Sequence, residues 1–143
     1  MTLKFSALLL AASLFISVLY AQPTHPKKAR HAAPSMGRGK VVYTNICLAC
    51  HMADGKGVPM MNPPLINTPY VLGDKTKLIT IVLNGFKEDV EINGQTYSNV
   101  MTPHKDLTDK QISDVLTYVR KSFGNKASSV RASEVKKVRA GLK

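Results

Sequence analysis

Two cysteines and a histidine lie within five consecutive residues, Cys47-Leu48-Ala49-Cys50-His51. The chain of 143 residues contains no other cysteine, so a disulfide framework is excluded and the pair cannot close a long loop. If the pair stands at the end of a helix, both thiols can reach one edge of a single flat ligand, with the imidazole next in line. This pentapeptide constrains the fold most, because the chain has to pack around whatever the thiols hold.

The spacing C-x-x-C-H is the attachment signature of a c-type haem. Cys47 and Cys50 would each add to a haem vinyl group and form a thioether, while His51 would bind the iron from one face. A zinc site normally needs four nitrogen or sulfur ligands, and only three stand together here, without a second cysteine pair. A thioredoxin-like dithiol would need a βαβ setting, which the sequence does not predict. We therefore expect one covalently bound haem c.

The composition agrees with a small domain built around a cofactor. The length is enough for one domain but hardly for two, and a domain of this size buries only about 60–70% of the surface that its unfolded chain exposes. Aromatic residues make up 6% of the chain and tryptophan is absent, so little bulky material is available for a core. A haem would supply the missing apolar mass.

The pentapeptide is predicted to end a helix. Ser35 is a candidate cap for a helix that runs to about His51, because several residues fall on one side of it at helical spacing. These residues are Val42, Tyr43, Ile46 and Cys50. Gly39 lies inside this helix, where a glycine costs about 1 kcal/mol relative to alanine, and it indicates close approach of another element.

A loop and a second helix are predicted to follow. Residues 53–73 hold four prolines and three glycines and should form an ordered but irregular loop. Asp74 should cap a short helix through Leu83, closed by Asn84-Gly85. Because residues 79–82 are mostly β-branched, a strand is the alternative there.

A hairpin and a last helix complete the predicted domain. Residues 90–97 alternate apolar and polar side chains around Asn93-Gly94, the strongest short hairpin signal. Thr108 and Gln111 form a capping box for a helix that Gly124 is expected to end. The apolar stripe of this helix consists of Ile112, Val115, Leu116, Val119 and Phe123.

The haem iron needs a sixth ligand or an open site, and methionine is the first candidate. Met52 adjoins His51, so it would have to reach the opposite face of the ring from the next residue. Met60 and Met61 follow soon after the haem helix and are expected to pack or to lie on the surface. Met36 precedes the motif by little more than ten residues.

Met101 is better placed, since it stands between the predicted hairpin and the last helix, in a loop stiffened by Pro103. A thioether ligand would favour Fe(II) and raise the reduction potential. The alternatives are Met101 as a filler of the core and His104 as the sixth ligand, although solvent exposure is the expectation for His104. The predicted metal ligands are therefore His51 and Met101.

A coordinating histidine is normally oriented by a hydrogen bond from its other ring nitrogen. Prolines bring free carbonyl groups and no competing N–H, so the segment Pro63-Pro64-Leu65 is a candidate acceptor.

The chain resembles the class I, single-haem cytochromes c over roughly residues 37–124. The resemblance rests on Gly39…Tyr43…Cys47-x-x-Cys50-His51, Gly55-Lys56-Gly57-Val58-Pro59, Pro63-Pro64-Leu65, Met101-Thr102-Pro103 and Leu107-Thr108-Asp109…Val115-Leu116-Thr117-Tyr118-Val119-Arg120.

This resemblance implies an all-α fold of three to four helices around one haem, with a short hairpin before the methionine loop. The first and last helices would cross at right angles, so that Gly39 and Tyr43 meet the stripe near Leu116 and Tyr118. It also implies that the carbonyl of Pro64 accepts from His51 and that Met101 is the axial sulfur.

The C-terminal part is similar to small cytochrome c domains that accompany periplasmic quinoprotein, sugar or alcohol dehydrogenases. This similarity covers residues 107–125 and the pattern Val130…Glu134-Val135-x-x-Val138-Arg139. Two departures from that group are Thr102, where proline often follows the ligand methionine, and Phe123, where tryptophan is common.

The N-terminus has the layout of a secretory signal peptide over residues 1–21: Lys4, an uncharged apolar run, and a cleavage site that leaves Gln22 first. A membrane anchor is the alternative, but the run is short for the ~20 apolar residues of a spanning helix. We expect a disordered basic, proline-rich linker over 22–34, a domain over 35–124, and a basic extension over 125–143 in which a short docking helix is conceivable.

The formal charge of +11 is carried mainly by the ends of the chain. Residues 22–34 contribute +3 and residues 125–143 contribute +5, whereas the predicted domain is only +2. Such basic ends favour electrostatic association with an acidic protein partner or a membrane surface. The alternative is that these charges only keep the protein soluble. Nucleic-acid binding is disfavoured, because the basic residues are not interleaved with aromatic ones.

These features together predict a periplasmic electron carrier or electron-transfer subunit rather than an enzyme, because a haem bound by histidine and methionine leaves no position for a substrate. Electrons would come from a dehydrogenase or a quinol-oxidising complex and pass to a terminal oxidase or similar acceptor. The alternatives are a haem enzyme with an open sixth site and an interaction module that works through its basic tail.

Overall fold

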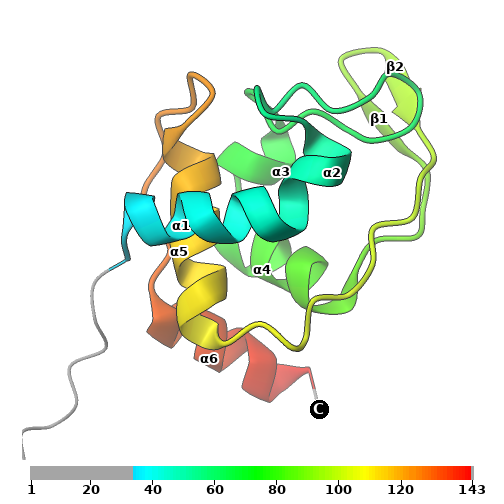
Figure 1. Ribbon diagram of the computed structural model, residues 1–143. Coiled ribbons are helices and arrows are strands. Elements are labelled where there is room, and N and C mark those ends of the chain that lie inside the picture. The colour runs from blue at the N-terminus through cyan, green and yellow to red at the C-terminus, as the bar shows by residue number, and fades with distance from the viewer. Residues whose placement is uncertain (1–33, 143) are drawn as a thin grey trace, which may run out of the picture. The chain divides into compact units, whose positions relative to one another are not determined.

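The computed structural model describes residues 34–142, which belong to one compact unit. The predicted signal over 1–21 and the linker over 22–34, apart from its last residue, lie outside this range. The described elements are helices with one hairpin (Figure 1), in the order α1 (Met36–Val42), η1 (Tyr43–Cys47), α2 (Leu48–His51), α3 (Pro69–Leu72), α4 (Lys75–Asn84), β1 (Val90–Ile92), β2 (Gln95–Tyr97), α5 (Asp109–Lys121) and α6 (Ala132–Gly141). Within 34–142, no helix has the length and apolar character needed to cross a bilayer.

The predicted first helix is confirmed, with an irregularity that the sequence did not indicate. α1, η1 and α2 follow one another without a break, and the hydroxyl of Ser35 accepts from the Arg38 amide at 3.4 Å. η1 is a π-helical turn in which the Leu48 amide donates to the carbonyl of Tyr43. Such a turn inserts one extra residue into the helix, so it shifts the register immediately before the first cysteine.

α1 crosses α5, as Figure 1 shows, and the contact is close at Gly39. A Cβ atom at Gly39 would lie 2.2 Å from the carbonyl oxygen of Asp114, so only glycine fits this approach. One turn later, Tyr43 packs against Tyr118 and Phe123 with ring centroids 5.4 and 5.3 Å apart. The predicted meeting of these helices is confirmed, and Phe123 fills its packing position.

The middle of the chain is more helical than predicted. α4 forms as a helix and not as a strand; the side chain of Asp74 accepts from the Lys77 amide at 2.7 Å, and Gly85 follows its last residue. α3 lies inside the predicted irregular loop and starts with Pro69 after Thr68, whose side chain accepts from the amide of Val71 at 3.1 Å. The hairpin forms around Asn93-Gly94 as predicted, with an antiparallel pairing.

The last predicted helix has its capping box at Thr108 and Gln111, but it ends at Lys121, before Gly124. It ends there because Ser122 is extended, with φ −106° and ψ 178°, and Phe123 then adopts a positive φ of 57°. The chain then returns along α5 and forms α6, which packs against α4 and α5. Of the basic extension, Val130 and Val135 are fully buried.

One core lies between the helices and beside the haem motif. Its largest fully buried side chains come from η1, α3, α4, α5, α6 and the segment just before α6. They are Tyr43, Val71, Ile79, Leu83, Ile112, Val130 and Val135.

Candidate haem-binding site

A cavity of about 240 Å³ opens beside the pentapeptide. Its walls come from η1, α2, α3, α4, α5, the hairpin and the segments around residues 63–65 and 99–107. Most of them are apolar, including Leu65, Val71, Leu78, Val82, Ile92 and Leu116. A mostly apolar cavity with a few converging polar groups is typical of a cofactor site.

Both cysteines line this cavity from the end of the first helical stretch. Cys47 closes η1 and is half-buried, whereas Cys50 in α2 is exposed; the two are not joined by a disulfide. Burial raises the pKa of Cys47 to about 11, so its thiol stays protonated at neutral pH. Reactive redox cysteines have lowered pKa values, so Cys47 does not have the electrostatics of a thiol–disulfide enzyme.

His51 lines the same cavity and is oriented through its other ring nitrogen. Nδ1 lies 2.9 Å from the carbonyl oxygen of Pro63. Because a carbonyl can only accept, Nδ1 must carry the proton, which leaves the lone pair on Nε2 for a metal. Burial lowers the pKa of His51, although the bond to Pro63 acts in the opposite direction. The imidazole is therefore neutral at pH 7, the form that binds metals.

The prediction that the carbonyl of Pro64 accepts from His51 is wrong: the acceptor is Pro63. Successive carbonyls of an extended chain point to opposite sides, so the register of the loop decides which one faces the ring. That register is fixed by the bridge between Val58 and Asn62 and by a 2.8 Å hydrogen bond from the Leu65 amide to Gly55. Pro64 itself lines the cavity.

Met101 lines the cavity from the loop before α5, half-buried against the core. Its amide donates to Phe86 at 2.8 Å, and the Phe86 amide donates back at 3.0 Å. Gly85, at φ 74°, allows this approach, because a Cβ there would lie 2.3 Å from the Met101 carbonyl oxygen. Among the methionines that the structure describes, Met101 alone lines the cavity; Met60 and Met61 are 65% and 49% exposed, which agrees with the surface alternative.

His104 also lines the cavity, which corrects the expectation that it is exposed to solvent. It is half-buried, and its amide donates to the carbonyl of Val82 at 2.9 Å. The loop backbone, tied to α4 in this way, brings His104 to the cavity that Met101 also lines. The cavity therefore contains two candidates for a sixth ligand.

Sequence reasoning missed the contribution of α3, which brings Tyr70 and Val71 to the cavity. A signal was present: Thr68 is a good N-cap and Pro69 is favoured at the first helical position. The helix has only four residues, too few for any hydrophobic periodicity, and it sits in a stretch dominated by proline and glycine.

The residues that line the cavity fit a covalent haem. Two thiols stand three residues apart at its wall, a neutral imidazole follows directly, and the remaining surface is mainly hydrocarbon. A methionine sulfur and a second imidazole are available for the remaining axial position.

Comparison with known proteins agrees with this geometry. The family model described as cytochrome c matches residues 36–123. The chain is 33% identical over 112 residues to cytochrome c-552 of Thermus thermophilus, which covers 71% of this chain and 84% of that protein. It is 37% identical over 105 residues to the cytochrome c subunit of the quinone alcohol dehydrogenase of Gluconobacter oxydans, covering 71% of this chain.

A third relative is the gluconate 2-dehydrogenase cytochrome c subunit of Pantoea cypripedii, 31% identical over 124 residues and 85% of this chain. The match spans only 22% of the Gluconobacter subunit and 28% of the Pantoea subunit, so those proteins are much longer. The family match covers more than half of the chain and includes every predicted haem residue. The chain therefore belongs to the cytochrome c family, and its cofactor is haem c attached at Cys47 and Cys50.

Proposed function

We propose that this cytochrome c carries single electrons in the periplasm with His51 and Met101 as axial ligands, and that it is an electron carrier or electron-transfer subunit and not an enzyme. The observation that supports this best is that both side chains line one cavity, although fifty residues separate them. If both axial positions are filled, no site is left for a substrate.

The haem would supply an iron that alternates between two oxidation states. The residues of this chain would hold the haem and set its reduction potential. Cys47 and Cys50 hold the group covalently. The Pro63 carbonyl fixes the ring of His51 through Nδ1. The thioether of Met101 favours the reduced state, and the apolar walls exclude water; both raise the reduction potential.

We further propose that the electron donor is a dehydrogenase or a quinol-oxidising complex, and the acceptor a terminal oxidase or similar protein. Relatives that are cytochrome subunits of alcohol, fructose and gluconate dehydrogenases support the first of these. Cys50, at the cavity wall, is exposed, so an electron could enter or leave at this edge. The basic residues of α6 would suit an acidic partner or an anionic membrane surface.

The axial assignment can be tested with Met101→Ala. In the ferric holoprotein, we expect this variant to lose the weak far-red absorption band of iron bound to methionine sulfur. Met61→Ala is the matched control, since Met61 is 49% exposed and lies outside the cavity, and it should keep the band. Retention of the band in Met101→Ala would overturn the assignment.

His104 provides the competing arrangement, because it lines the same cavity. If His104 were the ligand, His104→Ala would change the ferric spectrum and Met101→Ala would not. A haem enzyme with an open sixth site would show no far-red band in the wild type and would bind cyanide or imidazole readily.

The periplasmic location is proposed from the signal over residues 1–21 and can be tested separately. When the full sequence is expressed, the holoprotein should appear in the periplasmic fraction with Gln22 as its first residue, as measured by intact mass. A holoprotein that keeps residues 1–21 and sediments with membranes would instead indicate an anchor.

A further inference from the structure

A single arginine of α6 connects that helix to the end of the Met101 loop. Arg139 donates from Nη1 to the carbonyl of Lys105 at 2.9 Å and from Nη2 to that of Leu107 at 2.6 Å. Its Nε forms an ion pair with Asp109 at 2.7 Å. The family match ends at residue 123, so α6 lies beyond the region that the family model covers.

The three acceptors are every second residue of the chain, from Lys105 at the end of the loop to Asp109, the first residue of α5. A guanidinium is planar and presents its donors in a fixed fork, so contacts at Lys105, Leu107 and Asp109 define the path of this segment. Figure 1 shows α6 beside the first turn of α5, where the loop enters that helix.

α6 is itself well anchored, so its arginine is a fixed point. Val135 of α6 is fully buried in the core, and Glu134, near the start of α6, forms an ion pair with Lys75 of α4 at 3.2 Å. A mobile side chain would lose conformational entropy on binding the loop. Arg139 is only one-third exposed, and all three nitrogens of its guanidinium group donate hydrogen bonds, so the side chain is held in place.

Apart from the bonds to Arg139, the backbone of the loop forms few hydrogen bonds at this end. Met101 is paired with Phe86, and the His104 amide donates to Val82. Between His104 and α5, the loop has one internal backbone hydrogen bond among the described residues, from the Leu107 amide to the carbonyl of His104 at 3.3 Å. Leu107 is buried in the core, but Lys105 and Asp106 are exposed. An exposed stretch with few hydrogen bonds opens at low cost, and Arg139 supplies bonds that oppose such opening.

We propose that Arg139 is a positioning residue that keeps the Met101 loop closed over the iron, so that α6 controls exchange of the sixth ligand. The proposal rests on Met101 being that ligand. Replacing the methionine by an external ligand would require the loop to move away, and we expect that movement to strain or break the bonds to Arg139.

The test is a titration of the ferric holoprotein with imidazole, followed through the far-red band. Arg139→Leu should bind imidazole about tenfold more tightly, because one charged hydrogen bond corresponds to about that factor in an equilibrium constant. The variant should also lose the band at a lower temperature than its helical circular dichroism, whereas the wild type should lose both together. Arg139→Lys keeps the charge opposite Asp109 and should restore part of the wild-type behaviour.

Two controls separate positioning from general stability. Lys137→Gln removes an exposed charge from the same helix and should leave imidazole binding unchanged. Lys75→Gln removes the other ion pair of α6, which does not contact the loop. It should lower the unfolding temperature without separating band loss from unfolding.

The outcomes distinguish this proposal from the axial assignment. If the wild type shows no far-red band, Met101 ligation fails and this proposal fails with it. If the band is present but Arg139→Leu binds imidazole like the wild type, or Lys75→Gln has the same effect as Arg139→Leu, only the role of Arg139 is overturned.

Discussion

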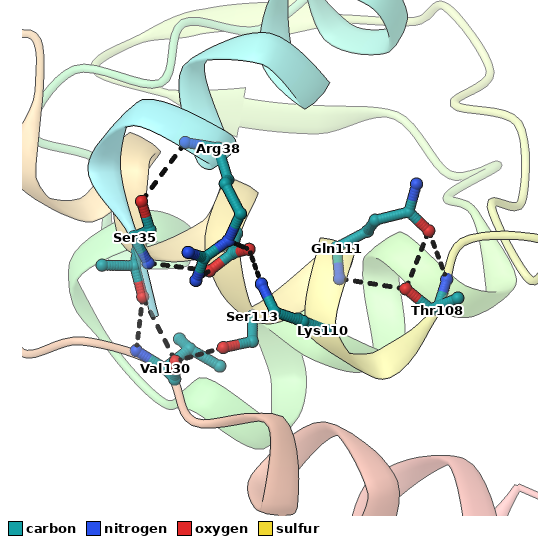
Figure 2. A network of polar contacts seen from close by, with 9 residues as sticks. Ser35, Arg38, Thr108, Lys110, Gln111, Ser113 and Val130 are labelled. Atoms are coloured by element: carbon teal, nitrogen blue, oxygen red, sulfur yellow. Dashed lines mark hydrogen bonds and ion pairs between the residues drawn. The ribbon is translucent and has the colours of Figure 1, made fainter. Parts of the chain in front are cut away.

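Asp114 is a buried carboxylate in the contact between α1 and α5, where an unpaired charge would be destabilising. It accepts from Arg38 Nε at 2.7 Å, from Lys110 Nζ at 3.0 Å and from the Ser35 amide at 2.7 Å. Figure 2 shows this cluster, with Arg38 reaching across from α1 and Lys110 from α5. Burial alone would raise the pKa of Asp114, but these hydrogen bonds outweigh it and the pKa is lowered.

Asp114→Asn should therefore destabilise the holoprotein in a pH-dependent way. A lowered pKa means that the ionised carboxylate stabilises the fold above its unfolded pKa of about 3.9. That contribution is lost as the pH falls through the lower, folded pKa. Denaturant unfolding should show a large difference between wild type and variant at pH 7 and a shrinking one under acid conditions.

Asp106→Asn is the matched control, because Asp106 is exposed on the loop before α5. It should change the free energy of unfolding little at either pH. A loss in Asp114→Asn that stayed constant or grew on acidification would contradict the charge-based explanation.

At the scale of elements, the sequence predicted helices well where capping residues and periodicity agree. Ser35, Asp74 and Thr108 begin helices as expected, because a capping side chain satisfies amides next to it in the chain. The π-turn at Tyr43–Cys47 had no such signal. α3 was missed because four residues show no periodicity. α5 ended early because Ser122 is extended and Phe123 after it adopts a conformation typical of glycine.

The crossing of α1 and α5 makes a prediction at this scale. Gly39→Ala would place a Cβ 2.2 Å from a backbone oxygen and 2.7 Å from the Cβ of Tyr118. The helices would have to separate, at a cost of about 1–3 kcal/mol. Thermal and denaturant unfolding of the holoprotein would measure the loss.

Gly37→Ala is an informative control in the same helix. A Cβ at Gly37 would meet only the hydroxyl of Ser35, at 3.9 Å. The exchange should stabilise α1 by up to about 1 kcal/mol through helix propensity alone. Equal effects at the two glycines would show that close approach of α5 is not what requires Gly39.

At the scale of the whole molecule, the segment predicted as a basic extension is part of the core. Ser113 and Thr117, on the side of α5 away from its apolar stripe, bind the backbone of Val130. Arg120 is buried and donates to carbonyls of Val71, Gly73 and Ser128. α5 is thus covered on both sides, by the apolar core and by the segment that contains Val130.

Val135→Ala should test this packing. Val135 is fully buried in α6, and its truncation would leave a cavity and cost about 2 kcal/mol. Lys136→Ala, at the next and exposed position, should be close to neutral. If both changes were neutral in denaturant unfolding, α6 would be only loosely attached, and its basic residues would act as a free tail.

The sequence by itself determined the chemistry of the site and most of the helices. Cys47, Cys50 and His51 lie within five consecutive residues, so their spacing alone identifies the haem. Helix caps and hydrophobic periods are equally local signals. Tertiary structure decided what depends on contacts between distant residues. These are the acceptor at Pro63, the approach of His104 to the cavity, and the burial of α6. A local pattern contains no information on the register of a loop, or on which polar side chains a later segment will cover.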